Sequence, residues 1–322
     1  MAYKSGDMDP LSDLLRAVRL TGAYFFLAEG AKPWSVAAAP AGERTPRVLP
    51  DAEHLMAYHV MTEGSCWGGL LGEPPVHMSE GDVLVFPHGD AHLMSSGPDN
   101  RSTLKPNWAT PPRFPLSVLL GQGARESSLV CGFLGCDLRP FNPLISALPR
   151  VIHMRPTGDG WLSTFPEQAV RESRAGRVGS DTMLTRMAEL MFIEVVRRHL
   201  ETIGPEQTGW LAGLRDPVVG AALTLLHARP AHAWTLADLA QEASTSRSVL
   251  AERFTQVLGV PPMQYLAQWR LQLAAELLAS GRTKIAAVGA QVGYESEAAF
   301  SRAFKRGTGV SPSAWRAQRR PG

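Results

Sequence analysis

The feature that most constrains how this 322-residue chain can fold is a repeat near its C-terminal end. The stretch SRSVLAERFTQVLGVPP aligns without a gap with SEAAFSRAFKRGTGVSP, which lies 50 residues further on. The two copies share a serine, a phenylalanine, a glycine and a proline at matching places: Ser246 and Ser296, Phe254 and Phe304, Gly259 and Gly309, Pro262 and Pro312. Serine favours the start of a helix and glycine favours its end. The sequence therefore predicts the same capped helix twice.

A shorter helical segment precedes each copy, LADLA at 236–240 and IAAVG at 285–289. Each half is then a helix, a tight turn and a second helix, which is the order of a helix-turn-helix unit. The residues expected to face the core of these units are Leu250, Phe254, Phe300 and Phe304. The positions between them are expected to face outward, and the last third of the chain is predicted to be all helical.

Charge is spread unevenly along the chain. Residues 215–322 hold 13 Lys and Arg against 7 Asp and Glu, whereas the remainder holds 19 against 23. The basic C-terminal third indicates a part of the chain that contacts phosphate, whereas the acidic remainder has no such requirement. The composition, with 44% hydrophobic and 19% charged residues, is that of a globular protein, and no apolar run is long enough for a transmembrane helix. We expect a cytoplasmic protein.

The first half of the chain has a different pattern. Short apolar runs such as AYFFLA, HLMAYHVM and DVLVFP lie between about Tyr24 and Ile152, with Gly and Pro between them, and they predict short strands in a sandwich or barrel. A helix is predicted over 181–201, with Asp181 at its start. The apolar side of this helix either packs on its own chain or pairs with a second subunit.

The C-terminal repeat resembles the double helix-turn-helix domain of the AraC/XylS family of transcription regulators. Its second copy, GYESEAAFSRAFKRGTGVSPSAWR at 293–316, is close to the family signature throughout. The resemblance implies that each second helix enters the DNA major groove, the two about 34 Å apart on one DNA face. The residues implied to contact DNA are Arg247, Ser248, Ala251, Glu252, Glu297, Ala298, Ser301, Arg302, Lys305 and Arg306.

These residues have different implied roles. Arg302 can donate two hydrogen bonds to guanine, and Glu297 can accept one from cytosine. Lys305 and Arg306 lie one turn further along the helix, where they are better placed for phosphate, which positions the protein without specifying sequence.

The N-terminal half is similar to the AraC-binding-like cupin domain found on a subset of these regulators. Gly81, Pro87, Gly89 and His92 fit the spacing G-x5-P-x-G-x2-H of the second cupin motif, with His92 aimed into the barrel. The fold class expected is α+β. Its parts are a cupin-type β-barrel sensor domain over 1–156, a helical linker and possible dimerisation segment over 157–213, and an all-α domain with two helix-turn-helix motifs over 214–322.

The first cupin motif is incomplete. His59 and Glu63 are spaced like its second His and its Glu, whereas Ala57 stands where its first His would be. His59, Glu63 and His92 are therefore candidates to hold an effector or a metal. Three such ligands plus water would suit a divalent transition metal. The missing fourth ligand favours a vestigial site or direct binding of a small molecule.

Other candidate ligands and reactive groups have weaker support. His77 and His88 are expected on surface loops. Cys131 and Cys136 are five residues apart, which puts them on opposite faces of a continuous strand unless Gly135 introduces a bulge. Cys66 lies on a separate strand. All three cysteines are expected to be buried structural thiols, with a thiol-based oxidant sensor as the alternative.

The function that these features favour is sequence-specific regulation of transcription. A cupin domain would sense a small molecule or stress signal and change promoter binding, in a homodimer that also contacts RNA polymerase. The alternative is a cupin metalloenzyme with an accessory DNA-binding domain, for which Ala57 leaves the ligand set short. The sequence has no nucleotide-binding loop or hydrolase triad to indicate another chemistry. We therefore expect a protein that is not an enzyme.

Overall fold

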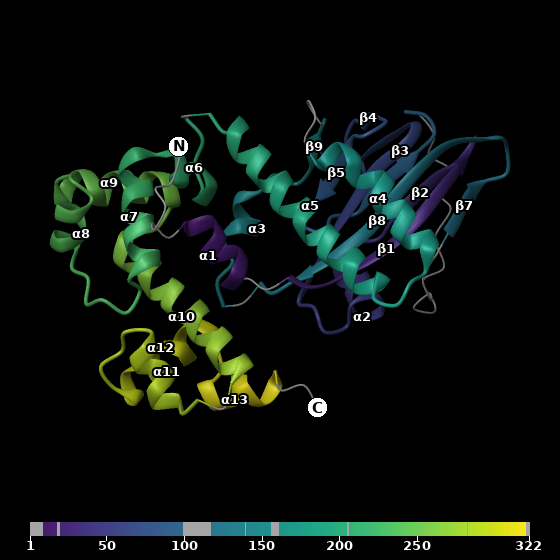
Figure 1. Cartoon of the computed structure of the whole chain (residues 1–322). Coiled ribbons are helices and arrows are strands. Elements are labelled where there is room, and N and C mark those ends of the chain that lie inside the picture. The colour runs from purple at the N-terminus through teal and green to yellow at the C-terminus, as the bar shows by residue number, and fades with distance from the viewer. Residues whose placement is uncertain are drawn as a thin grey trace. The chain divides into compact units, whose positions relative to one another are not determined.

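A computed structural model describes residues 9–17, 20–98, 117–138, 140–155, 161–204, 206–281 and 283–319 (Figure 1). Their contacts divide the chain into two compact units. The sheet unit comprises Leu20–Asp137 and Leu148–Thr202. The helical unit comprises Met1–Arg19, Leu138–Ala147 and Ile203–Gly322. The predicted sensor domain over 1–156 therefore loses two short segments, Met1–Arg19 and Leu138–Ala147, to the helical unit.

The sheet unit is built on one strongly curved sheet, which has nine strands in the described part of the chain. The strands are β1 (Leu20–Ala31), β2 (Ser35–Ala38), β3 (His54–Leu70), β4 (Val76–Ser79), β5 (Val83–Phe86), β6 (His92–Ser95), β7 (Ser117–Gly121), β8 (Arg125–Cys136) and β9 (Ile152–Met154). Six of them follow the order β2-β6-β3-β8-β1-β7, while β4 and β5 also pair with β3, and β9 pairs with β5.

The long strand β3 gives the sheet its curvature. Its first part pairs with β5 and β8, and its last part pairs with β4 and β6. A register shift between Met61 and Glu63 interrupts its pairing with β8, as expected where a strand bends. The α+β class predicted from the sequence is confirmed, and the cupin-type barrel takes the form of a curled half-barrel.

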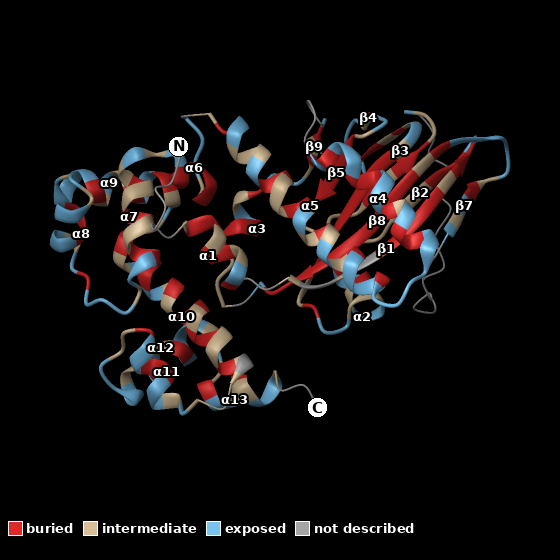
Figure 2. Ribbon diagram, in the orientation of Figure 1, coloured by how far each residue is buried: buried red, intermediate tan, exposed pale blue. Residues whose placement is uncertain are grey.

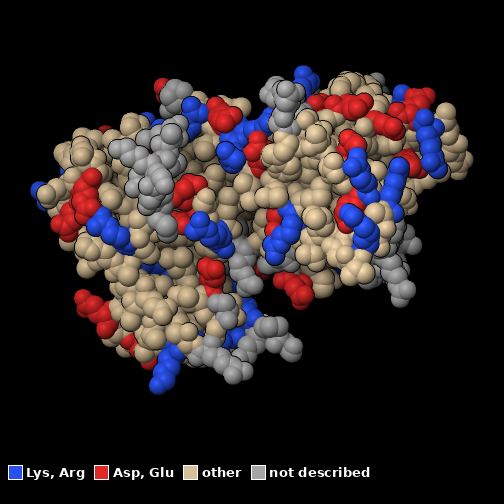
Figure 3. Space-filling model, viewed as in Figure 1, with Lys and Arg blue, Asp and Glu red and all other residues tan. Residues whose placement is uncertain are grey.

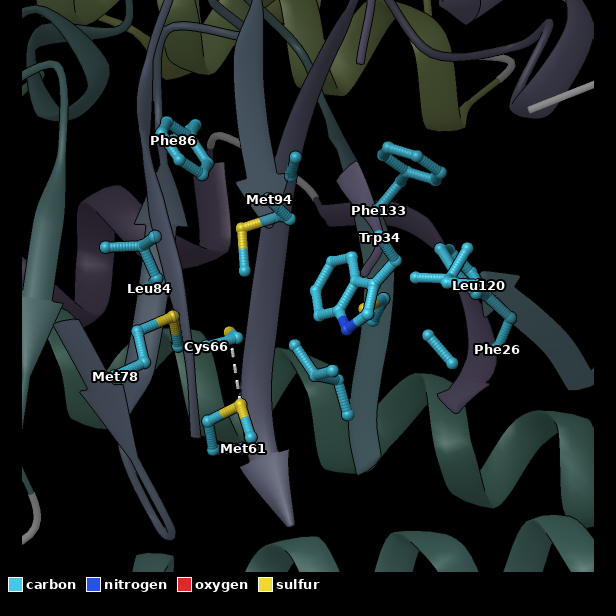
Figure 4. Packing of buried hydrophobic residues seen from close by; sticks show 14 of the residues in the cluster. Phe26, Trp34, Met61, Cys66, Met78, Leu84, Phe86, Met94, Leu120 and Phe133 are labelled. Atoms are coloured by element: carbon cyan, nitrogen blue, oxygen red, sulfur yellow. Dashed lines mark hydrogen bonds between the residues drawn. The ribbon is translucent and has the colours of Figure 1, made fainter. Parts of the chain in front are cut away.

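The two faces of the sheet are both apolar, but different elements cover them. Along β3, Leu55, Ala57 and Met61 belong to a cluster on the concave inner face (Figure 4). The alternate residues Tyr58 and Val60 are also fully buried. Strands β3 and β8 are buried along most of their length in Figure 2, and so are residues 25–28 of β1, because the outer face is covered as well.

Two helices pack on the outer face, α4 (Trp161–Ala175) and α5 (Ser180–Thr202) (Figure 1). Helix α5 buries Leu184, Met191 and Val195 against its own unit. A third helix, α2 (Ala41–Val48), contacts β3, and the Ala41 amide donates to the Gly89 carbonyl at 2.7 Å.

The helical unit contains α6 (Trp210–Arg215), α7 (Pro217–Ala228), α8 (Leu236–Glu242), α9 (Arg247–Leu258), α10 (Pro262–Ser280), α11 (Ile285–Gln291), α12 (Glu297–Thr308) and α13 (Pro312–Gln318). The repeated residues occupy equivalent places in the two halves. Ser246 and Ser296 accept hydrogen bonds from the third residue of α9 and of α12. Gly259 and Gly309 end these helices with φ of 75° and 82°, a conformation that suits glycine. The predicted duplication is thus present in the fold.

Two further helices complete this unit, α1 (Pro10–Ala17) and α3 (Pro143–Ala147). Helix α1 contacts α7 and α10, and α3 contacts α6. The side chain of Gln272 on α10 is 3% exposed and bridges the two segments. Its amide nitrogen donates to the Ala17 carbonyl at 2.7 Å, and its amide oxygen accepts from the Phe141 amide at 3.1 Å.

No helix in the described residues is both long and apolar enough to cross a membrane.

We predict that Gln272→Ala lowers the free energy of unfolding of the helical unit by about 2 kcal/mol, because it leaves the buried Ala17 carbonyl and the half-buried Phe141 amide without partners. Urea unfolding of the full chain measures the loss. The control is Gln264→Ala, which removes an exposed glutamine from the same helix. Equal stability of the two variants would show that the bridge contributes nothing.

Candidate nucleic-acid interface and buried sensor site

The second helix of each motif presents the residues that the sequence implies for DNA contact. On α9, Arg247, Ser248 and Glu252 are exposed and Ala251 is half-buried, whereas Leu250 is fully buried. The face of α9 that carries Leu250 therefore packs into the core of the unit, and the implied contact residues lie on the accessible face.

Helix α12 repeats this arrangement. Glu297, Ala298 and Arg302 are exposed and Ser301 is half-buried, while Phe300 and Phe304 are fully buried. Lys305 and Arg306 are exposed in its last turn. Among the described residues, no ion pair includes Arg302, Lys305 or Arg306. Their charges are therefore available to an external anion.

Arg270 on α10 connects the two motifs. Its guanidinium donates to the carbonyls of Pro230 at 2.7 Å, His232 at 2.8 Å and Gly293 at 3.3 Å. Pro230 and His232 precede the first motif, and Gly293 lies in the turn of the second. The sequence analysis missed this residue, because its acceptors are backbone atoms that no side-chain pattern marks.

A second structural arginine holds α9. Arg253 Nε donates to Asp216 at 2.7 Å, and the same carboxylate caps α7 by accepting from the amides of Val218 and Val219. An aspartate directly before Pro217 is the only sequence signal for this contact. Over the face drawn in Figure 3, Lys and Arg are interspersed with Asp and Glu, so this view shows no large surface of one charge.

The buried polar groups of the sheet unit form a chain of hydrogen bonds on its inner face. Cys131 Sγ lies 3.0 Å from His59 Nδ1, and His59 Nε2 lies 3.0 Å from His92 Nε2. His92 Nδ1 lies 2.9 Å from the Asp90 carbonyl oxygen. Phe86 stacks on the His92 ring with centroids 4.0 Å apart. The sequence prediction that His92 points into the barrel agrees with this position.

The acceptor at one end fixes every proton in this chain. The Asp90 carbonyl can only accept, so His92 Nδ1 carries a proton and, in the neutral ring, His92 Nε2 accepts from His59. His59 then carries its proton on Nε2, and its Nδ1 accepts from the Cys131 thiol. With both rings neutral, each group therefore has one compatible position for its proton.

Burial favours these neutral states. Burial, with the charge of Arg44 as a smaller cause, lowers the pKa of His92 to about 3 and that of His59 well below the usual range. Burial also raises the pKa of the Cys131 thiol. The chain of groups thus carries no net charge at neutral pH.

The three candidate metal ligands predicted from the sequence do not lie together in the structure. Glu63 is exposed beyond the register shift in β3, where Ser128 Oγ donates to it at 3.3 Å, and it lines a surface cleft of about 590 Å³. His59 and His92 lie together without it, and no cluster of three metal-ligating residues occurs among the described residues. His59, Glu63 and His92 therefore do not fit a metal ion as one ligand set.

The other histidines and the cysteines can also be placed. His77 is exposed on β4, and His88 Nε2 contacts the Leu148 carbonyl at 2.8 Å. Cys66, Cys131 and Cys136 are buried and free, and the regular register of β8 puts Cys131 and Cys136 on opposite faces, as predicted. Burial raises the pKa of Cys66 and of Cys136 to about 12, which disfavours the reactive thiolate.

Comparison with known proteins adds to this geometry. Residues 9–201 match the cupin family and residues 239–318 match the helix-turn-helix domain family. A putative AraC-like transcription regulator of Streptomyces antibioticus is 32% identical over 316 residues, covering 96% of this chain and 98% of the relative. The HTH-type transcriptional regulator AlkR of Acinetobacter baylyi is 31% identical over 274 residues, covering 83% and 89%. The similarity therefore extends over both units.

One solved structure illustrates the shorter matches. The DNA-binding domain of AdpA, a global transcriptional factor, in complex with a target DNA is 28% identical and covers 32% of this chain and 92% of that chain, with a TM-score of 0.31.

The neutral histidines predict how stability depends on pH. An unfolded histidine has a pKa of about 6.5. Below that pH the unfolded chain binds a proton that folded His92 does not, so the stability is complete above about pH 6.5 and is lost as the pH falls toward 3. The free energy of unfolding should therefore fall between pH 7 and pH 5, and we predict that this fall is about 2 kcal/mol smaller in His92→Gln.

Urea unfolding at pH 5, 6 and 7 measures this effect. His227 has a pKa lowered to about 3 in the same direction, so the comparison must be made between variants. His77→Gln, at an exposed position, is the matched control. If His92→Gln retained the full pH dependence of the original chain, His92 would already be charged or exposed in the folded state.

Proposed function

This chain belongs to the AraC-like family of transcription regulators, and from that premise we propose that it is a one-component sensor whose sheet unit binds a small molecule. In this proposal the helical unit binds promoter DNA through α9 and α12, and the bound molecule changes that binding. The supporting observation is that two equivalent recognition helices present exposed polar faces from one unit.

The spacing of the two motifs supports binding to one face of DNA. Helix α10 connects them and has 19 residues. At 1.5 Å per residue, a helix of this length spans about 28 Å, which is close to the roughly 34 Å of one DNA turn. The three hydrogen bonds of Arg270 keep both motifs fixed to this connection.

The connection between sensing and DNA binding follows the chain itself. Leu20 at the start of β1 pairs with Cys136 at the end of β8. The segment that precedes β1 in the sequence and the one that follows β8 both belong to the helical unit. We propose that a molecule bound on the inner face shifts the population between two arrangements of these segments, which Gln272 holds to α10 through Ala17 and Phe141.

The proposed assembly is a homodimer that pairs through α5. This helix packs its buried face on its own sheet, yet Met183 and Leu190 remain 53% and 54% exposed, one heptad apart on the same side. A second copy of the helix would cover them. We also propose that the protein acts in the cytoplasm, that it contacts RNA polymerase at promoters and that it is not an enzyme.

Selection of genomic DNA fragments by the purified full chain tests the proposed function. Enrichment of one recurring site is the expected result, and failure to enrich any sequence at moderate salt would refute it.

We predict that Arg302→Ala reduces the free-energy difference between the preferred base and the other bases at one position of that site by about 1–3 kcal/mol. The reason is that the variant loses the two hydrogen bonds that the arginine would donate to a guanine. The control is Lys305→Ala, which should weaken binding to all sequences and lower the salt slope by about one. Mobility shifts with single-base variants of the site measure both effects. Unchanged discrimination in Arg302→Ala would mean that another residue of α12 reads the base.

We predict that Leu190→Lys shifts the chain from dimer to monomer, because it places a charge in the apolar contact. Leu119→Lys is the matched control, since Leu119 on β7 is also 54% exposed. Sedimentation velocity of both variants measures the oligomeric state. A Leu190→Lys dimer as stable as that of the original chain would exclude α5 as the interface.

A further inference from the structure

The interior of the sheet unit contains an arginine without a hydrogen-bond acceptor among the described residues. Arg44 on α2 is 4% exposed, and its Nε, Nη1 and Nη2 atoms have no partner in this part of the chain. Its guanidinium carbon lies 4.9 Å from the centroid of the Phe133 ring. A cation–π contact leaves the N–H donors unsatisfied, and a buried cation is costly unless it is paired. The site therefore favours an acceptor with negative charge.

The groups near Arg44 cannot supply that charge. Arg44 covers Phe133, which lies two residues from Cys131 along β8, and its charge lowers the pKa of both His59 and His92. Burial keeps both rings neutral and the thiol of Cys131 protonated, because it lowers the pKa of His59 and His92 and raises that of Cys131. Because burial lowers the pKa of Arg44 only to about 10, the guanidinium is charged at neutral pH. The interior thus holds one positive charge beside a neutral chain of hydrogen bonds.

The sign of this charge decides between two kinds of ligand. A metal ion would be repelled by Arg44, and the position where a cupin metal site would have its first histidine is Ala57. Ala57 lies opposite Phe133 and Phe86 on the neighbouring strands, and Phe133 is the ring that Arg44 covers. A guanidinium and two aromatic rings therefore surround the position where a metal ligand would be. This environment favours binding of an anion.

The surrounding walls define the rest of the ligand. The inner-face cluster is apolar and rich in aromatic rings and methionines, as Figure 4 shows for Phe26, Phe86, Met94 and Phe133. A single carboxylate would balance one guanidinium and accept two of its hydrogen bonds. We propose that Arg44 binds the carboxylate of a small organic acid whose apolar part packs on this inner face.

The helix that carries Arg44 also borders solvent. Ala41, Gly42, Thr45 and Pro46 of α2 line a surface cleft of about 690 Å³. Helix α2 has only eight residues, and no side chain caps its N-terminus. Because Ala41 belongs both to the inner-face cluster and to the lining of this cleft, we place the entry of the acid at α2. This inference rests on the proposed function, in which the sheet unit binds a small molecule.

Thermal unfolding of the full chain tests the proposal. The probes are sodium hexanoate, decanoate and benzoate, with hexanamide and benzamide as uncharged counterparts and inorganic phosphate as a second anion. We expect at least one carboxylate to raise Tm by about 3 °C or more at saturation, with no rise from its amide or from phosphate. Absence of a rise with all three carboxylates, or an equal rise with an amide or with phosphate, overturns the proposal.

Variants identify the group responsible. Arg44→Gln should weaken carboxylate binding at least about tenfold, and Arg44→Lys should keep part of the response. Arg47→Gln removes an exposed arginine from the same helix and should respond like the original chain. Without carboxylate, Arg44→Gln should unfold at the same Tm or higher, because it removes an unpaired buried charge. A clearly lower Tm than that of Arg47→Gln would mean that Arg44 is a structural residue, and the proposal would fail.

The same proteins are tested for selection of DNA fragments. If the original chain enriches a site while no carboxylate stabilises it, the anion site is refuted and the proposed regulator stands. If carboxylates act through Arg44 while no DNA sequence is enriched, the anion site stands and the proposed regulator is refuted.

Discussion

The sheet unit depends on the register of β8 between β1 and β3. This register places Cys131 opposite both Phe26 and His59, and Leu129 opposite both Ala28 and Met61. Side chains alternate between the faces of a sheet, so a slip of one residue would turn a whole strand's inner residues outward. The hydrogen bond between Cys131 and His59 exists because the register is the observed one. The proton order of the buried chain, in which both imidazoles and the thiol are neutral, depends on this pairing.

The helical unit depends on local signals to a greater degree. Each motif carries its own serine cap, its own glycine end and its own pair of buried aromatic or aliphatic residues, so each can form with few distant contacts. Distant contacts then fix the parts to one another. Arg270 ties the two motifs to α10, and Gln272 ties α10 to segments that lie 255 and 131 residues away in the sequence.

This difference explains what the sequence could predict. The duplicated motif, its caps and the exposed faces of α9 and α12 follow from residue types at fixed spacing, and the inward position of His92 follows from a motif. The separation of Glu63 from His59 could not be predicted, because it depends on a register shift within β3. Arg44 was missed since arginine is normally a surface residue, and only the packing of α2 against β3 shows that it is buried. Gln272 carries no local signal at all.

The unpaired charge of Arg44 would also give the sensor its response. A ligand shifts an equilibrium only by as much as its affinities for the two states differ. In the ligand-free state a buried guanidinium without an acceptor raises the free energy of the arrangement that encloses it. A carboxylate removes that penalty in the enclosed arrangement alone, so the differential affinity arises at Arg44 itself. Arg44 is carried by α2, which contacts β3, and β3 pairs with β8. A change in how α2 closes on β3 would therefore reach the end of β8 through the pairing of these two strands.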